Sequence, residues 1–92
     1  MSDELEITAE GLKDMPLQMI AKTILTDWSG RGAGVHPHAA PYLTALLTMP
    51  SVHSYYGVDS GETVVRYFLS NARSWRGPVA KLVKAELNRR VK

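Results

Sequence analysis

The residues whose chemistry stands out are the cations in the last third of the chain. Residues 66–92 contain eight Lys and Arg side chains and one acid, a net charge of +7, whereas residues 1–65 contain three bases and eight acids, a net charge of −5. Cationic side chains that share a surface bind phosphates and release the counterions of a nucleic acid. The sequence therefore predicts a basic C-terminal helical face that contacts an anionic partner, most plausibly nucleic acid. We expect phosphate contacts from Lys81, Lys84, Arg89 and Lys92, with Arg66 and Arg73 as outer contacts.

The same charge distribution can also arise without a partner, in three ways that stay open. Bases in the last turn of a helix complement the helix dipole without any ligand. A lysine stripe is also the usual solvated face of an amphipathic helix. Finally, the acidic first part of the chain can pair with the basic last part, within one molecule or across a dimer.

Four aromatic side chains favour a second class of function. Tyr55, Tyr56, Tyr67 and Trp75 are of the types that are enriched where proteins contact each other. The alternative to nucleic-acid binding is therefore a protein–protein adaptor or a small homodimer that uses these four residues.

Three histidines are the candidate metal ligands. His36 and His38 flank Pro37, and His53 lies fifteen residues beyond His38. Three imidazoles can hold zinc in an open site, but a spacing of two in a loop does not align two ligands on one helix face. The chain has no cysteine, which excludes disulfides and thiolate sites. We expect no metal, and whether the three histidines converge stays open.

Neither a catalytic nor a nucleotide-binding motif is present. No serine lies in a nucleophile elbow, and no two acids are paired in an apolar setting. The glycines at 30, 32 and 34 follow a predicted helix rather than a strand and lack the Lys-Ser ending of a nucleotide-binding loop, so they predict a flexible connector. A non-enzymatic binding protein without a cofactor is therefore expected.

These side chains are positioned by segments whose apolar residues recur at helical spacing. After one short turn begun by Thr8, a first long helix is expected to start at Asp14 as N-cap and to bury Leu17, Ile20, Ala21, Ile24, Leu25 and Trp28. A second helix is expected from about residues 38–41 to Thr48. A short one is expected over residues 51–56, closed by Gly57.

The two basic helices are expected in the last third of the chain. Asp59 and Glu62 have the spacing of a capping box, and the helix after them turns Val64, Val65, Phe68, Leu69, Ala72 and Trp75 inward. Gly77 and Pro78 end this helix and begin the last one, which buries Val79, Leu82, Val83 and Leu87. Glu86 and Arg90 lie on the apolar side of the last helix, which suggests that its end projects from the core.

The predicted fold is a single all-α domain, a compact bundle of about five helices, two of them short. Residues 8–92 form the helical domain, and residues 1–7 form a flexible acidic lead-in. The expected core contains Leu17, Ile24, Trp28, Leu46, Phe68, Leu69, Trp75, Leu82 and Val83. No signal peptide and no membrane-spanning stretch is readable, so a cytoplasmic location without membrane contact is expected.

Overall fold

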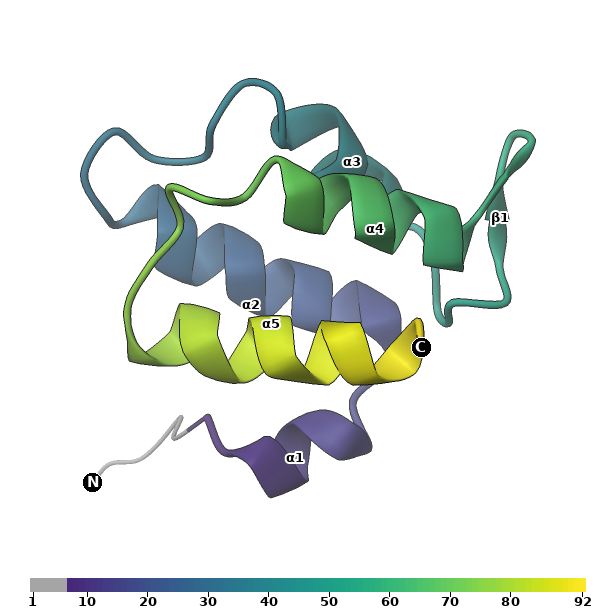
Figure 1. Ribbon diagram of the computed structural model, residues 1–92, viewed down its shortest axis with the longest axis horizontal. Helices are drawn as coiled ribbons and strands as arrows, with labels where there is room; N and C mark the ends of the chain where they lie inside the picture. Colours follow the sequence, from purple (N-terminus) through teal and green to yellow (C-terminus); the bar gives the residue numbers. More distant parts are fainter. Residues whose placement is uncertain (1–6) are drawn as a thin grey trace.

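Most of the regular structure is helical, as the spacing of the apolar residues predicts. The computed structural model describes residues 7–92, which form five helices and one two-stranded hairpin (Figure 1). The elements in chain order are α1 (Ala9–Lys13), α2 (Leu17–Ser29), α3 (Ala40–Leu46), β1 (Tyr55–Tyr56), β2 (Asp59–Ser60), α4 (Gly61–Ser70) and α5 (Pro78–Arg90).

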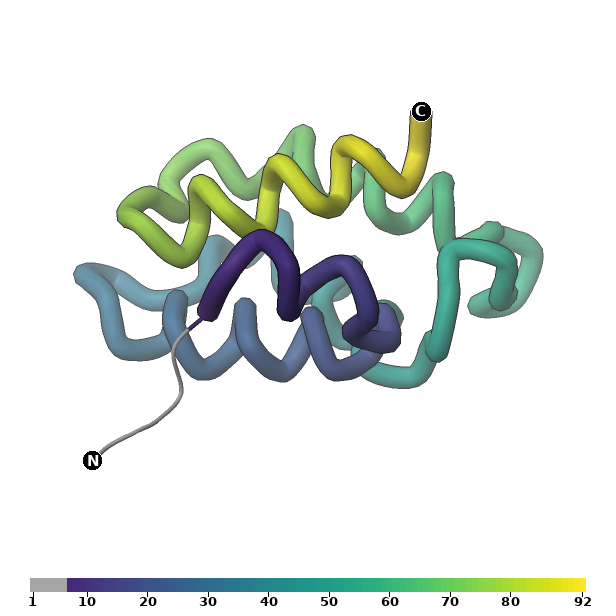
Figure 2. The backbone as a smooth tube through the Cα atoms, turned by 90° about the horizontal axis from the view of Figure 1, so that it is seen from below, coloured from purple at the N-terminus to yellow at the C-terminus, as the bar shows by residue number. Residues whose placement is uncertain are grey.

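The helices pack around one core, and the loops gather at the two ends of the molecule. Helix α5 contacts α1, α2 and α4, while α3 packs against both α2 and α4. The connection from α2 to α3 and the connection from α4 to α5 lie at the same end, on the left of Figures 1 and 2. The hairpin and the C-terminus lie at the other end.

The core is built around three aromatic rings. Trp28 stacks on Trp75 with ring centroids 5.8 Å apart, and Phe68 meets both indoles edge to face. Most of the expected core is confirmed, although Leu69 and Leu82 are only partly buried. Leu25 was expected on the buried face of α2 but is 40% exposed, because it lies at the edge of the stripe.

Two helix starts differ from the predicted ones by a few residues. Asp14 is the C-cap of α1, and α2 begins only at Leu17, after Pro16. The α4 cap is Ser60 rather than Asp59, and its hydroxyl accepts a hydrogen bond from the backbone N–H of Thr63. The short turn begun by Thr8 is confirmed as α1.

The strict all-α expectation is wrong in one segment. Residues 51–56, expected as a short helix, form a turn followed by β1, and β1 pairs antiparallel with β2. Gly57 adopts a φ of +65° in the hairpin turn, a region that favours glycine. Gly61 follows the hairpin against Val52, where a Cβ atom would lie 2.6 Å from the Val52 Cα. Close backbone packing therefore requires glycine there and joins the start of α4 to the turn that precedes the hairpin.

The predicted acidic lead-in lies outside the described residues except for Ile7, which is partly buried against the core. Within residues 7–92, the helices are too short or too polar to cross a bilayer.

Candidate nucleic-acid interface

The predicted basic face is divided between the two ends of α5. Lys81 lies in the first turn of α5 and Arg89 in its last, which places them about 12 Å apart along the helix axis. Arg66 and Lys92 line the same shallow hollow at the C-terminal end. Arg66 also donates a hydrogen bond to the Val91 carbonyl, and its guanidinium is 3.9 Å from the Glu62 carboxylate.

Lys84 was expected to face solvent and contact phosphate, but its ammonium group is turned inward. Its Nζ donates to the backbone carbonyls of Ala72 and Trp75, at 2.7 and 2.6 Å, and lies 5.8 Å from the centre of a Trp75 ring. Burial lowers the pKa of Lys84, and the charge of Arg76 lowers it further. Lys84 thus holds the connection between α4 and α5 in place, and this contact removes it from the phosphate-contacting set.

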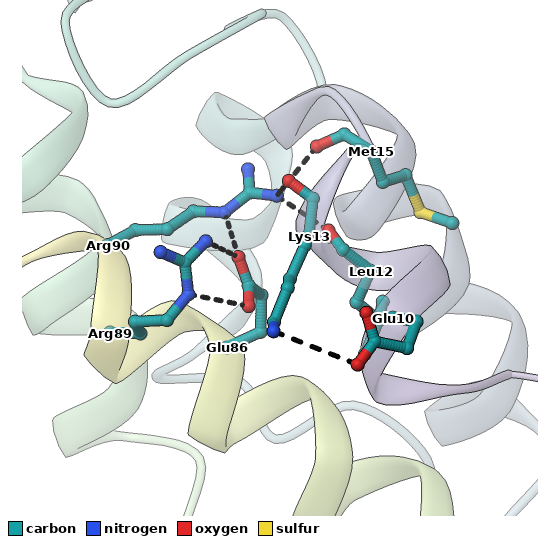
Figure 3. A network of polar contacts seen from close by, with 7 residues as sticks. All are labelled: Glu10, Leu12, Lys13, Met15, Glu86, Arg89 and Arg90. Carbon is teal, nitrogen blue, oxygen red and sulfur yellow. Dashed lines mark hydrogen bonds and ion pairs between the residues drawn. The ribbon is translucent and has the colours of Figure 1, made fainter.

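The end of α5 does not project, contrary to expectation, because α1 covers it (Figure 3). The Glu86 side chain is 5% exposed, and its carboxylate accepts two hydrogen bonds from Arg89 and one from Arg90, at 2.6–3.0 Å. Arg90 Nη2 also donates to the carbonyls of Leu12, Lys13 and Met15. Arg90 therefore joins α5 to the C-terminus of α1, and Arg89 is already paired with an acid.

A second group of cations lies at the opposite end of the molecule. Arg31 follows α2, Arg73 and Arg76 lie in the connection between α4 and α5, and Lys81 lies in the first turn of α5. All four are exposed, and we call them the loop-end cluster. Among the described acids only Asp27 pairs with a member of this cluster.

Three adjoining hollows separate these cations. The central cleft, of about 290 Å³, lies between residues 31–34 and residues 74–76, with Trp28 beneath it. On one side is a hollow of about 240 Å³ beside His36 and Arg73, and on the other a hollow of about 270 Å³ beside Lys81. None of the residues that line the three hollows carries a carboxylate.

Arg31 is held in the central cleft by Asp27, which also binds Trp75, 48 residues further along the chain. Asp27 Oδ2 accepts hydrogen bonds from Arg31 Nε and from Trp75 Nε1, both at 2.9 Å. Burial raises the pKa of Asp27, but these two hydrogen bonds and the charge of Arg31 outweigh it, so the pKa lies below its usual value. The guanidinium lies against Gly77, where a Cβ would be 3.1 Å from Arg31 Cζ. An ionised Asp27 thus fixes the orientation of Arg31.

Sequence reasoning missed Arg31 as a candidate because it lies in the acidic part of the chain. The available signal was its spacing of four from Asp27, because Arg31 lies at the start of the glycine-rich connection that follows a predicted helix. Arg73 and Lys81, both predicted as contacts, do lie at this end.

The predicted partner-contacting aromatics do not form one surface. Tyr55 is 70% exposed and Tyr56 about half exposed on the hairpin, together with Val58, which is 92% exposed. Tyr67 is half exposed on α4, and its ring centroid is 5.5 Å from that of Tyr42. Trp75 is completely buried, so it offers no surface to a partner, contrary to that expectation.

The histidines are placed in two separate segments. The His36 and His38 rings are 5.1 Å apart, and His36 Nδ1 accepts a hydrogen bond from the His38 backbone N–H. His53 lies in the turn before the hairpin. Residues 7–92 contain no group of three or more His, Cys, Asp or Glu side chains arranged to hold a metal ion.

In comparisons with known proteins, the chain matches no protein-family model, no curated protein and no solved structure.

Proposed function

We propose that this protein is a non-enzymatic binding protein that contacts nucleic acid through phosphates at the loop-end cluster. The observation that carries the proposal is the convergence of four exposed cations from three chain segments around hollows without carboxylates. Arginine suits this role because its planar guanidinium binds phosphate oxygens in pairs. Contacts of this kind fix the position of a nucleic acid and carry little sequence information.

The proposed interface differs from the predicted face in its members. It retains Arg73 and Lys81, adds Arg31 and Arg76, and leaves out Lys84, whose ammonium is held by two carbonyls. The remaining predicted contacts, Arg66, Arg89 and Lys92, lie near the other end of α5. They therefore serve as comparison positions for the experiment.

Binding should weaken steeply with salt if phosphate contacts supply the affinity. We expect the anisotropy of a labelled DNA duplex to report binding whose log–log salt slope is about −4, as four to five phosphate contacts require. The double variant Arg73→Gln/Lys81→Gln should reduce the magnitude of this slope by about two, because each lost contact releases roughly one counterion fewer.

The matched control is Lys22→Gln/Lys92→Gln, which removes the same charge from exposed positions outside the cluster. Its slope should stay close to that of the unmodified protein. If both double variants lose the same affinity, overall charge rather than this surface causes the binding. If neither duplex nor single strand binds at about 50 mM salt, where such contacts are strong, the proposed function is wrong.

A protein partner is the second candidate, and the exposed hairpin supports it. Tyr55, Tyr56 and Val58 place apolar surface in solvent at one end of the molecule. An interface there predicts that the mass measured by sedimentation rises with protein concentration, and that Tyr55→Ser/Val58→Ser abolishes the rise. A mass that stays monomeric at all concentrations contradicts self-association through the hairpin.

A further inference from the structure

The three hollows at the loop end adjoin one another through shared lining residues. The hollow beside His36 shares Ser74 with the central cleft. The central cleft in turn shares Trp75 and Arg76 with the hollow beside Lys81. Each hollow has its own exposed cation, in the order Arg73, Arg31 with Arg76, and Lys81. We call this row of three adjoining hollows, lined by residues 28–36 and 70–84, the groove.

The central cation of this groove, Arg31, has hydrogen-bond donors without an acceptor among the described residues. Arg31 uses its Nε to donate to Asp27, and no described residue accepts a hydrogen bond from Nη1 or Nη2. Asp27 and the backbone at Gly77 hold the guanidinium from two sides. A guanidinium fixed in this way loses little conformational freedom when an anion binds, which favours binding.

We propose that this groove binds a single strand of nucleic acid, with one backbone phosphate held between Nη1 and Nη2 of Arg31 in the central cleft. The assignment rests on the nucleic-acid binding proposed above and adds to it the form of the strand and the residue that holds the phosphate. Arg73 and Arg76 contact the same strand from the two sides of the cleft. Lys81 lies at the end of the groove.

The shape of the loop end favours a single strand over a duplex. The cations here lie around hollows between two loops and not on a protruding helix or ribbon of the kind that enters the major groove of a duplex. A positively charged groove that follows the backbone is the usual arrangement for binding single strands. His36 lines the first hollow and offers an exposed imidazole on which a base can stack.

Arg31→Lys tests the assignment because it keeps the charge and removes the paired donors. We expect this variant to bind a labelled oligothymidine about tenfold more weakly than the unmodified protein does. The matched control, Arg66→Lys at the other end of the molecule, should change the dissociation constant by no more than about twofold. The unmodified protein should prefer oligothymidine to a duplex of equal length at the same salt concentration.

Trp75→Phe tests how Arg31 is positioned. Phenylalanine keeps an aromatic ring in the core but removes the indole N–H that donates to Asp27. We expect binding about threefold weaker, because a less fixed Asp27 leaves Arg31 less well oriented. The Arg31 Nε–H resonance in NMR spectra should shift on addition of oligothymidine in the unmodified protein and shift less in Trp75→Phe, a change that loss of stability alone does not produce.

The outcomes separate this inference from the proposed function. If nucleic acid binds with the expected salt slope but Arg31→Lys behaves like Arg66→Lys, the phosphate assignment is wrong and the proposed function stands. If a duplex binds as tightly as oligothymidine, the single-strand assignment is overturned. If neither binds, the proposed function fails first.

Discussion

Replacing Trp75 with alanine is expected to lower the free energy of unfolding by about 4 kcal/mol, the loss typical of truncating a large buried aromatic side chain. Trp75 is completely buried and stacks on Trp28, with an angle of 19° between the ring planes. Its indole N–H is also the hydrogen-bond partner of Asp27. Urea denaturation followed by circular dichroism measures the loss.

Trp75→Phe is the matched control for this prediction. It keeps an aromatic ring against Trp28 and Phe68, so the expected loss is only about 1–2 kcal/mol, from lost volume and one hydrogen bond. A loss of less than about 2 kcal/mol for Trp75→Ala would contradict the close packing of the three rings, because no well-packed core closes so large a cavity at so small a cost.

The long helices could be predicted because their apolar residues recur at a period that only a helix satisfies. In α4, Val64, Val65 and Phe68 are spaced so that a helix turns all three inward, and the structure buries them. The hairpin could not be predicted in the same way. Its strands are two residues long, too short for an alternating pattern, and the aromatic pair Tyr55 and Tyr56 is equally compatible with a helix.

The candidate site could be predicted only in part because charge alone does not say where a side chain points. Arg73 and Lys81 are exposed, as the sequence indicated. Lys84 has the same charge, but its ammonium is turned inward because it donates to the Ala72 and Trp75 carbonyls in the connection between α4 and α5. Arg31 joins the site through contacts with Asp27 and Gly77, one nearby and one 46 residues away. The contact with Gly77 follows from tertiary packing and leaves no periodic pattern in the sequence.

The environment of Glu86 also depends on tertiary packing, since Glu86 is buried on the helix that α1 packs against. We expect Glu86→Gln to lower the free energy of unfolding by about 3 kcal/mol at neutral pH, because Arg90 then keeps a partly buried charge without its counterion. Glu10→Gln is the matched control. Glu10 is 86% exposed and 3.8 Å from Lys13, and exposed pairs of this kind contribute little to stability.

The pH dependence of this loss identifies the ion pair as its cause. Hydrogen bonds from Arg89 and then Arg90 outweigh the effect of burial and lower the pKa of Glu86 from 4.5 to about 2. Because the folded pKa lies below the unfolded one, the stabilisation is complete above about pH 4.5 and is lost as the pH falls toward 2. It amounts to at most about 3 kcal/mol. The stability difference between the unmodified protein and Glu86→Gln should therefore be constant near neutral pH and shrink in acid. A difference that stays constant down to about pH 2.5 would show that Glu86 is not held as an ionised carboxylate by the two arginines.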